Sequence, residues 1–220
     1  MCGRFTQRKP AEVIAREFKV EVPELFPRYN IAPTQEVLAV REGGEGREAA
    51  ALRWGLIPSW AKDPAMGARM INARAETIAE KPAFRGAYMR RRCLVPADGF
   101  YEWGLAGGRK VPYLFQLKGG ALFGIAGLWE RWEQDDEALE TCALLTTEAN
   151  ETVRSVHDRM PVIISADDYD LWLDPSVSRP EMLQHLLKPL SPTLMIAHPV
   201  PKLVNNPGYD DPRCVEPSSR

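Results

Sequence analysis

The feature that most constrains the fold is a series of short apolar runs, rich in β-branched and aromatic residues, spread over most of the 220-residue chain. Glycine, proline or aspartate bounds many of these runs, which is typical of strands joined by turns. Runs of strands with scattered helices favour a largely antiparallel or barrel-like sheet over a parallel α/β fold. The expected strands cover residues 37–40, 50–57, 92–97, 99–103, 112–117, 122–132, 142–147, 161–165 and 193–197.

A few helical segments interrupt these runs. Residues 10–18 predict a helix with Pro10 at its N-terminus and with Val13, Ile14 and Phe18 on one face. Further helices are expected at residues 82–92, 166–173 and 180–188. Together these patterns predict an α+β fold, with a largely antiparallel, barrel-like β-sheet core and peripheral helices.

The domain organisation follows from what the sequence lacks. We find no composition shift that would mark a linker and no internal repeat. The prediction is therefore a single domain over residues 1–220. Residues 166–220 are expected to pack on it as helices, a strand and a tail.

Composition and charge exclude several function classes. The formal net charge of −2 gives no global attraction to nucleic acid, so a polyanion site must be a local patch. The four cysteines have no CxxC pair, and the three histidines do not join them at metal-ligand spacing. We therefore expect no metal, no other cofactor and a reducing compartment. No apolar run approaches the roughly 20 residues that span a bilayer, and the first residues lack a secretory signal, so no membrane association is expected.

The chain begins MCGRF, which places a cysteine directly after the initiator methionine. Methionine is normally removed before a small side chain, so the mature chain would begin with Cys2 and carry a 1,2-aminothiol. The reference pKa is about 7.7–8.0 for an α-amine and about 8.5 for a thiol, so both nucleophiles are partly available near neutral pH. The alternative is that Cys2 is an incidental residue on a frayed terminus.

Polar residues also stand at unusual places in the predicted strands. The stretch MINARAE (70–76) puts Asn72, Arg74 and Glu76 at period two, so one strand face would carry an amide, a guanidinium and a carboxylate. That face would line a polar groove or face water.

Two further residues are candidates for proton transfer. Glu102 stands between Tyr101 and Trp103, where partial desolvation would raise the pKa of its carboxyl toward a useful acid or base value. His157 follows a short helical pattern and precedes a strand, and its imidazole would move protons near pH 7. The alternatives are a solvent-facing strand glutamate and a surface histidine.

Several motifs, taken in order, resemble those of the SRAP family, named for SOS response-associated peptidase. The resemblance runs from residue 2 to about residue 165 and resumes weakly in VNNP near residue 205. The motifs are MCGRF, RYNIAPT (28–34), RWGLIPSWAKD (53–63), INARAET (71–77), RRCLVPADGFYEW (91–103), TTEAN (146–150) and HDRMPVII (157–164).

The resemblance implies a protein that senses abasic sites in single-stranded DNA, including junctions with duplex, and shields them through a covalent crosslink in the DNA-damage (SOS) response. An abasic deoxyribose exposes an aldehyde when its ring opens. The Cys2 amine would condense with this aldehyde, and the thiol would then close a thiazolidine. The implied protein is a cytoplasmic monomer, associated with the nucleoid if the source is bacterial.

The family's roles carry over to matching residues of this sequence. Cys2 is the expected nucleophile, Glu102 the acid/base, His157 the proton shuttle, and Asn72 the residue that positions the amine and the sugar. The expected phosphate contacts are Arg4, Arg74, Arg85 and Arg159. The residues expected to stack on bases or to block a paired strand are Pro33, Trp54, Leu56 and Trp103, although each aromatic residue is otherwise a core residue. The cluster Arg90–Arg92 would extend the patch or form a solvated helix face.

The family name also implies self-removal of Met1, although an ordinary aminopeptidase would suffice, and imine chemistry permits lyase activity. Two alternatives stay open. The first is an N-terminal-nucleophile amidohydrolase or glutaminase, whose thiol attacks an amide carbonyl. The second is a single-stranded DNA binding module that has no catalytic activity, in which Cys2 is incidental.

Overall fold

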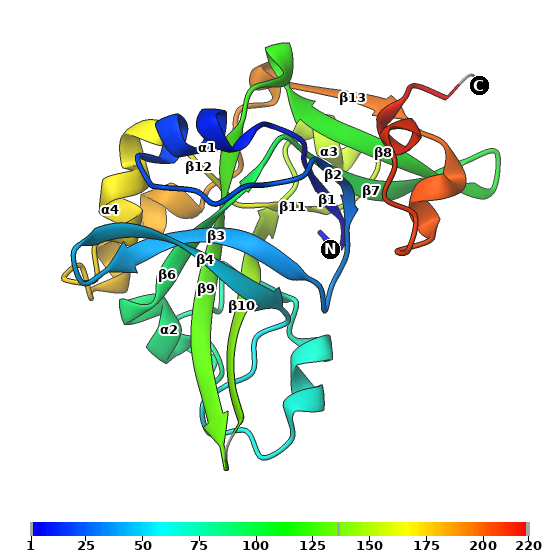
Figure 1. Cartoon of the computed structure of the whole chain (residues 1–220). Helices are drawn as coiled ribbons and strands as arrows, with labels where there is room; N and C mark the ends of the chain where they lie inside the picture. The colour runs from blue at the N-terminus through cyan, green and yellow to red at the C-terminus, as the bar shows by residue number, and fades with distance from the viewer. Residues whose placement is uncertain (1, 136, 219–220) are drawn as a thin grey trace.

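Five strands close into a barrel at the centre of the molecule (Figure 1). The computed structural model describes residues 2–135 and 137–218. The strand order is β10-β4-β3-β6-β9, and β9 pairs with β10 again, which closes the ring. Neighbours are antiparallel except β10 and β4, which are parallel. The bounds are β3 Glu36–Gly43, β4 Gly46–Trp54, β6 Arg92–Ala97, β9 Phe123–Gln134 and β10 Glu137–Glu148.

Strand β6 illustrates why this sequence forms a barrel covered by helices. All six of its residues are buried. Cys93 and Val95 belong to one core cluster, and Leu94 belongs to another that includes residues of helices α1 (Ala11–Phe18) and α4 (Tyr169–Leu173). A strand buried on both faces reads as a continuous apolar run, as CLVPA (93–97) does after Arg92. The predicted α+β fold with a largely antiparallel barrel is confirmed.

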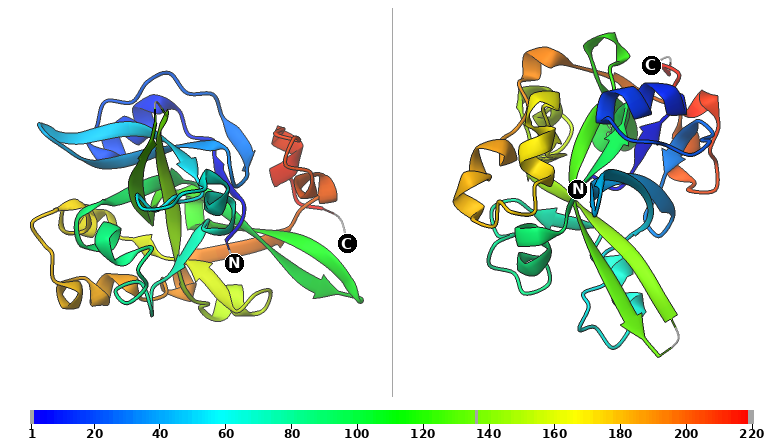
Figure 2. Two further views of the ribbon diagram at one scale, coloured as in Figure 1. Left: turned by 90° about the horizontal axis from the view of Figure 1, so that it is seen from below. Right: turned by 60° about the vertical axis from the view of Figure 1, so that its left-hand side comes forward.

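A second, five-stranded antiparallel sheet packs against the barrel, and its strand order is β13-β8-β7-β1-β2. Phe5 of β1 lies opposite Ile31 of β2 on one side and Phe100 of β7 on the other. The start of the chain therefore runs between two strands, where the second sheet meets the barrel (Figures 1 and 2). The bounds are β1 Phe5–Gln7, β2 Arg28–Ile31, β7 Gly99–Ala106, β8 Arg109–Leu117 and β13 Met195–Pro199.

Three short strands extend the barrel sheet: β5 Asn72–Arg74, β11 Arg159–Pro161 and β12 Ile163–Ile164. Thr146 of β10 pairs with Arg74 of β5 and with Pro161 of β11. A strand has two edges, so β5 and β11 flank the end of β10 on opposite sides. This arrangement brings the INARAET and HDRMP segments together.

Helix α1 (Ala11–Phe18) agrees with the prediction for residues 10–18. Ile14 and Phe18 are buried, whereas Val13 is half-buried. The ring of Phe18 stacks on Tyr169 with centroids 4.9 Å apart, which fixes α1 against α4 (Tyr169–Leu173). In the described residues no helix has the length and apolar character that crossing a bilayer requires.

The other predicted helices are shorter than expected. Helix α2 covers only Arg85–Arg90, because β6 begins at Arg92. The segment 166–173 forms a 3₁₀ turn followed by α4. The prediction for 180–188 is wrong in type, since the chain forms two 3₁₀ turns, Pro180–Met182 and Gln184–Leu187. Pro189 explains the end of this segment, because the residue before proline is pushed into extended backbone.

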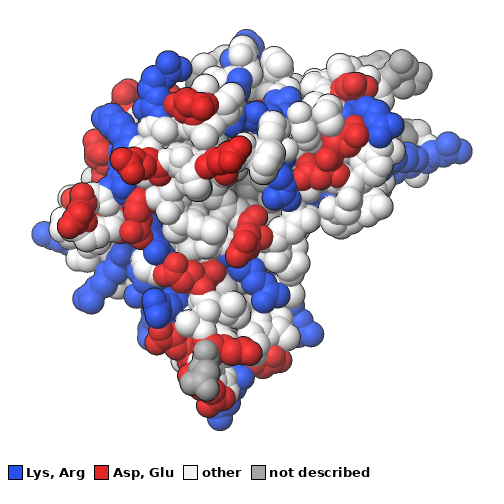
Figure 3. Space-filling view, viewed as in Figure 1, with Lys and Arg blue, Asp and Glu red and all other residues white. Residues whose placement is uncertain are grey.

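The expectation for the cluster Arg90–Arg92 is wrong for Arg92, which is 2% exposed. Its guanidinium donates to the carbonyls of Tyr88 and Met89 in α2 and of Trp172 and Asp174 at the end of α4. Arg92 therefore satisfies carbonyls near two helix ends rather than contacting DNA. On the face in Figure 3, acidic and basic side chains are interspersed, in keeping with the near-neutral net charge.

Candidate active site at the N-terminal cysteine

Cys2 lies fully buried where the second sheet meets the barrel, in a cluster with Phe5 and Trp54. The Nδ2 of Asn72, on β5, donates to the Cys2 carbonyl at 2.8 Å. Burial, and then the carboxylate of Glu102, raise the pKa of the Cys2 thiol to about 12. The sequence-based expectation of a partly ionised thiol is therefore wrong for this environment, where the thiol stays protonated at neutral pH.

Glu102, on β7, is only 3% exposed. The backbone N–H of Tyr101 donates to the carbonyl of Arg4 at 2.9 Å, which holds β7 alongside the first residues of the chain. Burial raises the pKa of the Glu102 carboxyl above its ordinary value, and the nearby His157 partly opposes this shift. The raised pKa favours the protonated form, which a general acid requires.

His157 follows α3 (Glu151–Arg154), a single helical turn. Asn150 caps the N-terminus of this turn, and its side-chain oxygen accepts a hydrogen bond from the backbone N–H of Val153. The His157 Nε2 lies 3.9 Å from Oε2 of Glu102. The His157 Nδ1 accepts the backbone N–H of Arg159 at 3.0 Å. The structure thus brings Cys2, Asn72, Glu102 and His157 together from four separate segments of the chain.

The four candidate phosphate ligands differ in their surroundings. Arg74 and Arg85 are exposed. Arg4 is half-buried, and its Nη1 donates to Asn30 Oδ1 at 2.8 Å and to the carbonyl of Val204 at 2.7 Å. Arg159 is paired with Glu76 through both terminal nitrogens. A phosphate would have to displace protein partners from Arg4 and Arg159, whereas Arg74 and Arg85 point into solvent.

Two of the four candidates for contact with DNA bases are buried core residues, which corrects the expectation for them. Trp54 and Leu56 have no exposed surface, and the indole N–H of Trp54 donates to the carbonyl of Ile71 at 2.9 Å. A base could not stack on either side chain without opening the barrel. Pro33 and Trp103 are half-buried, and the indole N–H of Trp103 donates to Asn205 Oδ1 at 2.7 Å.

Sequence reasoning missed Trp60, whose side chain is 59% exposed. The loop that carries it is braced, because the carbonyl of the neighbouring Ala61 accepts from the buried indole of Trp132 at 2.6 Å. Gly55 (φ +136°) and Gly67 also cross closely, and a Cβ on Gly55 would lie 2.7 Å from the Gly67 carbonyl. The available signal was position: Trp60 follows Pro58 outside the strand, whereas Trp54 lies within it.

Sequence reasoning also missed Asn30, which the RYNIAPT motif contains. Its side chain is fully buried, and its Nδ2 donates to the carbonyls of Asn206 at 2.9 Å and Tyr209 at 2.7 Å. Together with the bond to Arg4, these contacts fix the C-terminal segment against the first residues of the chain. The VNNP motif therefore packs beside the site rather than apart from it.

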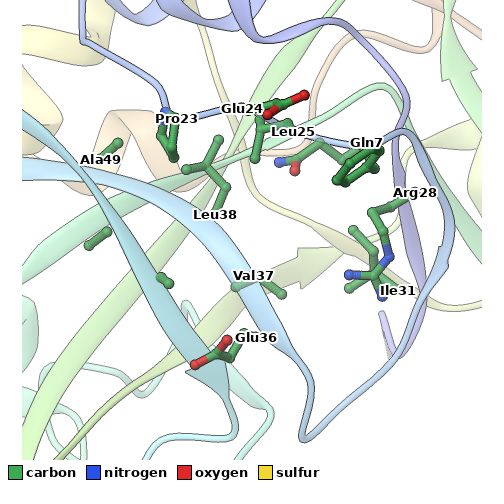
Figure 4. Close-up of a pocket in the computed structure, with 13 residues that line it drawn as sticks. Gln7, Pro23, Glu24, Leu25, Arg28, Ile31, Glu36, Val37, Leu38 and Ala49 are labelled. Atoms are coloured by element: carbon green, nitrogen blue, oxygen red, sulfur yellow. The ribbon is translucent and has the colours of Figure 1, made fainter.

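The cavity in Figure 4 is separate from these residues. It has a volume of about 280 Å³ and lies between the loop at Pro23–Phe26 and strands β3 and β4. Cys2, Asn72, Glu102 and His157 do not line it.

The expected absence of a metal or other cofactor and the expected removal of Met1 both stay predictions. Within the described residues no group of three or more His, Cys, Asp and Glu side chains is placed to hold a metal ion. The expected removal of Met1 concerns a residue outside the described ones.

Comparisons with known proteins identify the family of this chain. The family model described as SOS response associated peptidase (SRAP) matches residues 1–207. The chain is 46% identical to the abasic site processing protein YoaM of Bacillus subtilis over 94% of each chain, and 29% identical to YedK of Escherichia coli, also named an abasic site processing protein, over 99% of this chain and 100% of that one. A crystal structure of a Bacteroides thetaiotaomicron protein superposes with a TM-score of 0.89 and 28% identity, covering 99% of this chain and 100% of that chain. The chain therefore belongs to the SOS response associated peptidase family.

Proposed function

We propose that this protein recognises abasic sites in single-stranded DNA and shields them by forming a thiazolidine through Cys2. The observation that carries the proposal is the placement of Cys2 beside the amide of Asn72 and the buried carboxyl of Glu102, which in turn lies 3.9 Å from the imidazole of His157. The names of its relatives, abasic site processing proteins, support the choice of substrate.

The chemistry needs no oxidant or reductant. After Met1 is removed, the Cys2 amine adds to the sugar aldehyde and gives a carbinolamine. Loss of hydroxide, protonated by Glu102, gives an iminium ion and water. The thiol then passes its proton to the Glu102 carboxylate, and the sulfur adds to the iminium carbon. In total the reaction releases one water, closes the thiazolidine ring and returns Glu102 to its protonated form.

The surroundings of each group suit these steps. A protonated, buried Glu102 is ready to donate to the departing hydroxyl, and as a carboxylate it becomes the base that the neutral Cys2 thiol requires. The amide of Asn72 holds the Cys2 carbonyl without titrating. Its Oδ1 is buried and has no hydrogen-bond partner among the described residues, so it is available to accept from the freed amine. His157, next to Glu102, would move a proton to or from the sugar oxygen.

Binding to DNA would rest on local contacts. Arg74 and Arg85 are exposed cations for phosphates, and Trp60 offers an exposed ring on a braced loop for base stacking. Arg4 and Arg159 would contribute only if DNA displaced their protein partners. Contacts of this kind read the backbone rather than the bases, so we expect little sequence preference and weaker binding at high salt.

Two finer activities belong to the same proposal. Hydrolysis of the Met1–Cys2 bond by the site itself would expose the amine. An imine that escapes ring closure would permit β-elimination, in which the sugar loses its C2′ proton, the C3′–O bond breaks and the strand is cut. We expect slow cutting, because the adjacent thiol competes for the imine.

The decisive experiment mixes the protein with an oligonucleotide that carries one abasic site and analyses it on a denaturing gel. A shifted band is expected for the wild type and no band for Cys2→Ala, while Cys142→Ala, which removes another buried cysteine from within strand β10, is the matched control. Absence of a wild-type band would contradict the proposal. Glutamine hydrolysis by the same sample would instead favour an amidohydrolase.

A further inference from the structure

An ion pair connects the segment after β5 with β11, on the two sides of β10. Arg159, the first residue of β11, donates through Nη1 to Glu76 Oε1 at 2.6 Å and through Nη2 to Glu76 Oε2 at 2.9 Å. Its Nη2 also donates to the Thr146 carbonyl at 2.6 Å. Since Thr146 lies on β10 between β5 and β11, the pair spans β10. The Arg159 side chain is 16% exposed, so this two-point contact is shielded from solvent at one end.

Each end of this pair is close in sequence to a residue of the site. Glu76 lies two residues beyond β5, the strand that carries Asn72. Arg159 lies two residues beyond His157, and its backbone N–H donates to the Nδ1 of that ring at 3.0 Å. The pair therefore anchors the side chain of the same residue whose backbone N–H contacts the imidazole.

The Nδ1 of His157 has two neighbours that cannot both be satisfied. The carboxylate of Asp158 also lies 3.0 Å from it. A ring nitrogen that accepts the Arg159 N–H carries no proton, whereas a nitrogen that donates to Asp158 must carry one. With Arg159 held in place, the proton of the neutral ring sits on Nε2, which faces Glu102 at 3.9 Å.

We propose that Glu76, acting through Arg159, is a positioning residue that keeps His157 in the tautomer with its proton on Nε2. In this tautomer His157 presents a hydrogen-bond donor to Glu102 and the sugar. Without the pair, the Arg159 backbone would loosen, Nδ1 would take the proton and donate to Asp158, and the ring would present a lone pair instead. The effect on catalysis rests on the proposed function, but the tautomer does not.

The tautomer is tested by ¹⁵N NMR of the imidazole at alkaline pH, where the ring is neutral. His157→Gln assigns the signal among the three histidines. The wild type is expected to show an unprotonated Nδ1, and Glu76→Gln, which turns an amide N–H₂ toward the guanidinium, a shift toward protonated Nδ1. Glu80→Gln removes the same charge from an exposed position four residues on and should match the wild type. A wild type already protonated on Nδ1, or an unchanged Glu76→Gln, would overturn the proposal.

Crosslinking kinetics separate positioning from DNA contact. We expect Glu76→Gln and Arg159→Lys to slow crosslinking at saturating abasic DNA by about 10- to 100-fold, part of the 10²–10⁴ that general acid–base catalysis contributes, with an unchanged half-saturating concentration. Arg159→Lys keeps the charge but loses the two-point contact, so it reports on the same pair if Glu76→Gln folds poorly. A change only in half-saturation would assign Arg159 to DNA binding and refute a positioning role. A wild type that never crosslinks would refute the proposed function while the NMR result still stood.

Discussion

The substitution Asn30→Asp should destabilise the protein and loosen the wall of the site. It replaces the Nδ2 that faces the carbonyls of Val204, Asn206 and Tyr209, at 3.3, 2.9 and 2.7 Å, with an oxygen. The amide carries two N–H donors, and the loss of each hydrogen bond lowers the free energy of unfolding by about 1 kcal/mol. The new carboxylate oxygen faces buried carbonyl acceptors, which lowers it by about 1–2 kcal/mol more. The bond from Arg4 remains and becomes charge-assisted. We expect a net loss of about 2–3 kcal/mol.

For a chain of this length, 1 kcal/mol lowers the melting temperature by about 2–4 °C, so the expected fall is about 4–12 °C. Thermal unfolding followed by circular dichroism measures it. Gln184→Glu makes the same amide-to-carboxylate change at an exposed position and should melt within about 1 °C of the wild type. Crosslinking by Asn30→Asp should also slow, because Asn30 holds Arg4 and the C-terminal segment, which lie beside the site. An unchanged melting temperature of Asn30→Asp would refute the stabilising role that we assign to the hydrogen bonds of Asn30.

Three further comparisons between variants have distinct expected outcomes. Trp54→Phe should lose about 2–4 kcal/mol in denaturant unfolding, because it leaves a cavity and removes one of the two hydrogen bonds that the Ile71 carbonyl accepts. Trp60→Ala should keep its stability and bind single-stranded DNA about 1–3 kcal/mol more weakly by fluorescence anisotropy. The fold raises the pKa of Glu102, so its contribution to stability is present below the ordinary value of 4.5 and is lost as the pH rises through the folded pKa; the wild type should lose stability relative to Glu102→Gln across that window, and parallel pH profiles would contradict the shift. Arg74→Ala should weaken DNA capture and reduce the slope of the logarithm of the binding constant against the logarithm of the salt concentration by about 0.7, while Arg109→Ala, at the exposed first residue of β8, should change neither.

The strands and α1 could be predicted from the sequence because their signals are local. Alternating or continuous apolar runs between Gly, Pro and Asp define β6 and β9, and the spacing of Ile14 and Phe18 defines α1. The segment 180–188 also has helical spacing, but the chain forms two 3₁₀ turns there and Pro189 ends the segment. Local propensity alone does not reveal how far such a helix extends.

The site was less predictable where tertiary contacts decide a side chain's role. Trp54 and Trp60 belong to one motif, and only the closure of the barrel buries the first while the loop exposes the second. One partner of Arg4, the carbonyl of Val204, stands 200 residues away in the chain, so the role of Arg4 beside the C-terminal segment had no sequence signal. Asn72 and Arg74 do follow strand alternation, but the chain turns before Glu76, which instead pairs with Arg159.

Mass spectrometry of the N-terminal peptide from the crosslinked protein tests the central claim most directly. The account predicts a peptide that begins at Cys2, carries the sugar with the loss of one water, and has a thiol that no longer reacts with an alkylating reagent. A peptide that retains Met1 and still carries DNA, or a sugar attached to another residue while the Cys2 thiol stays reactive, would contradict it.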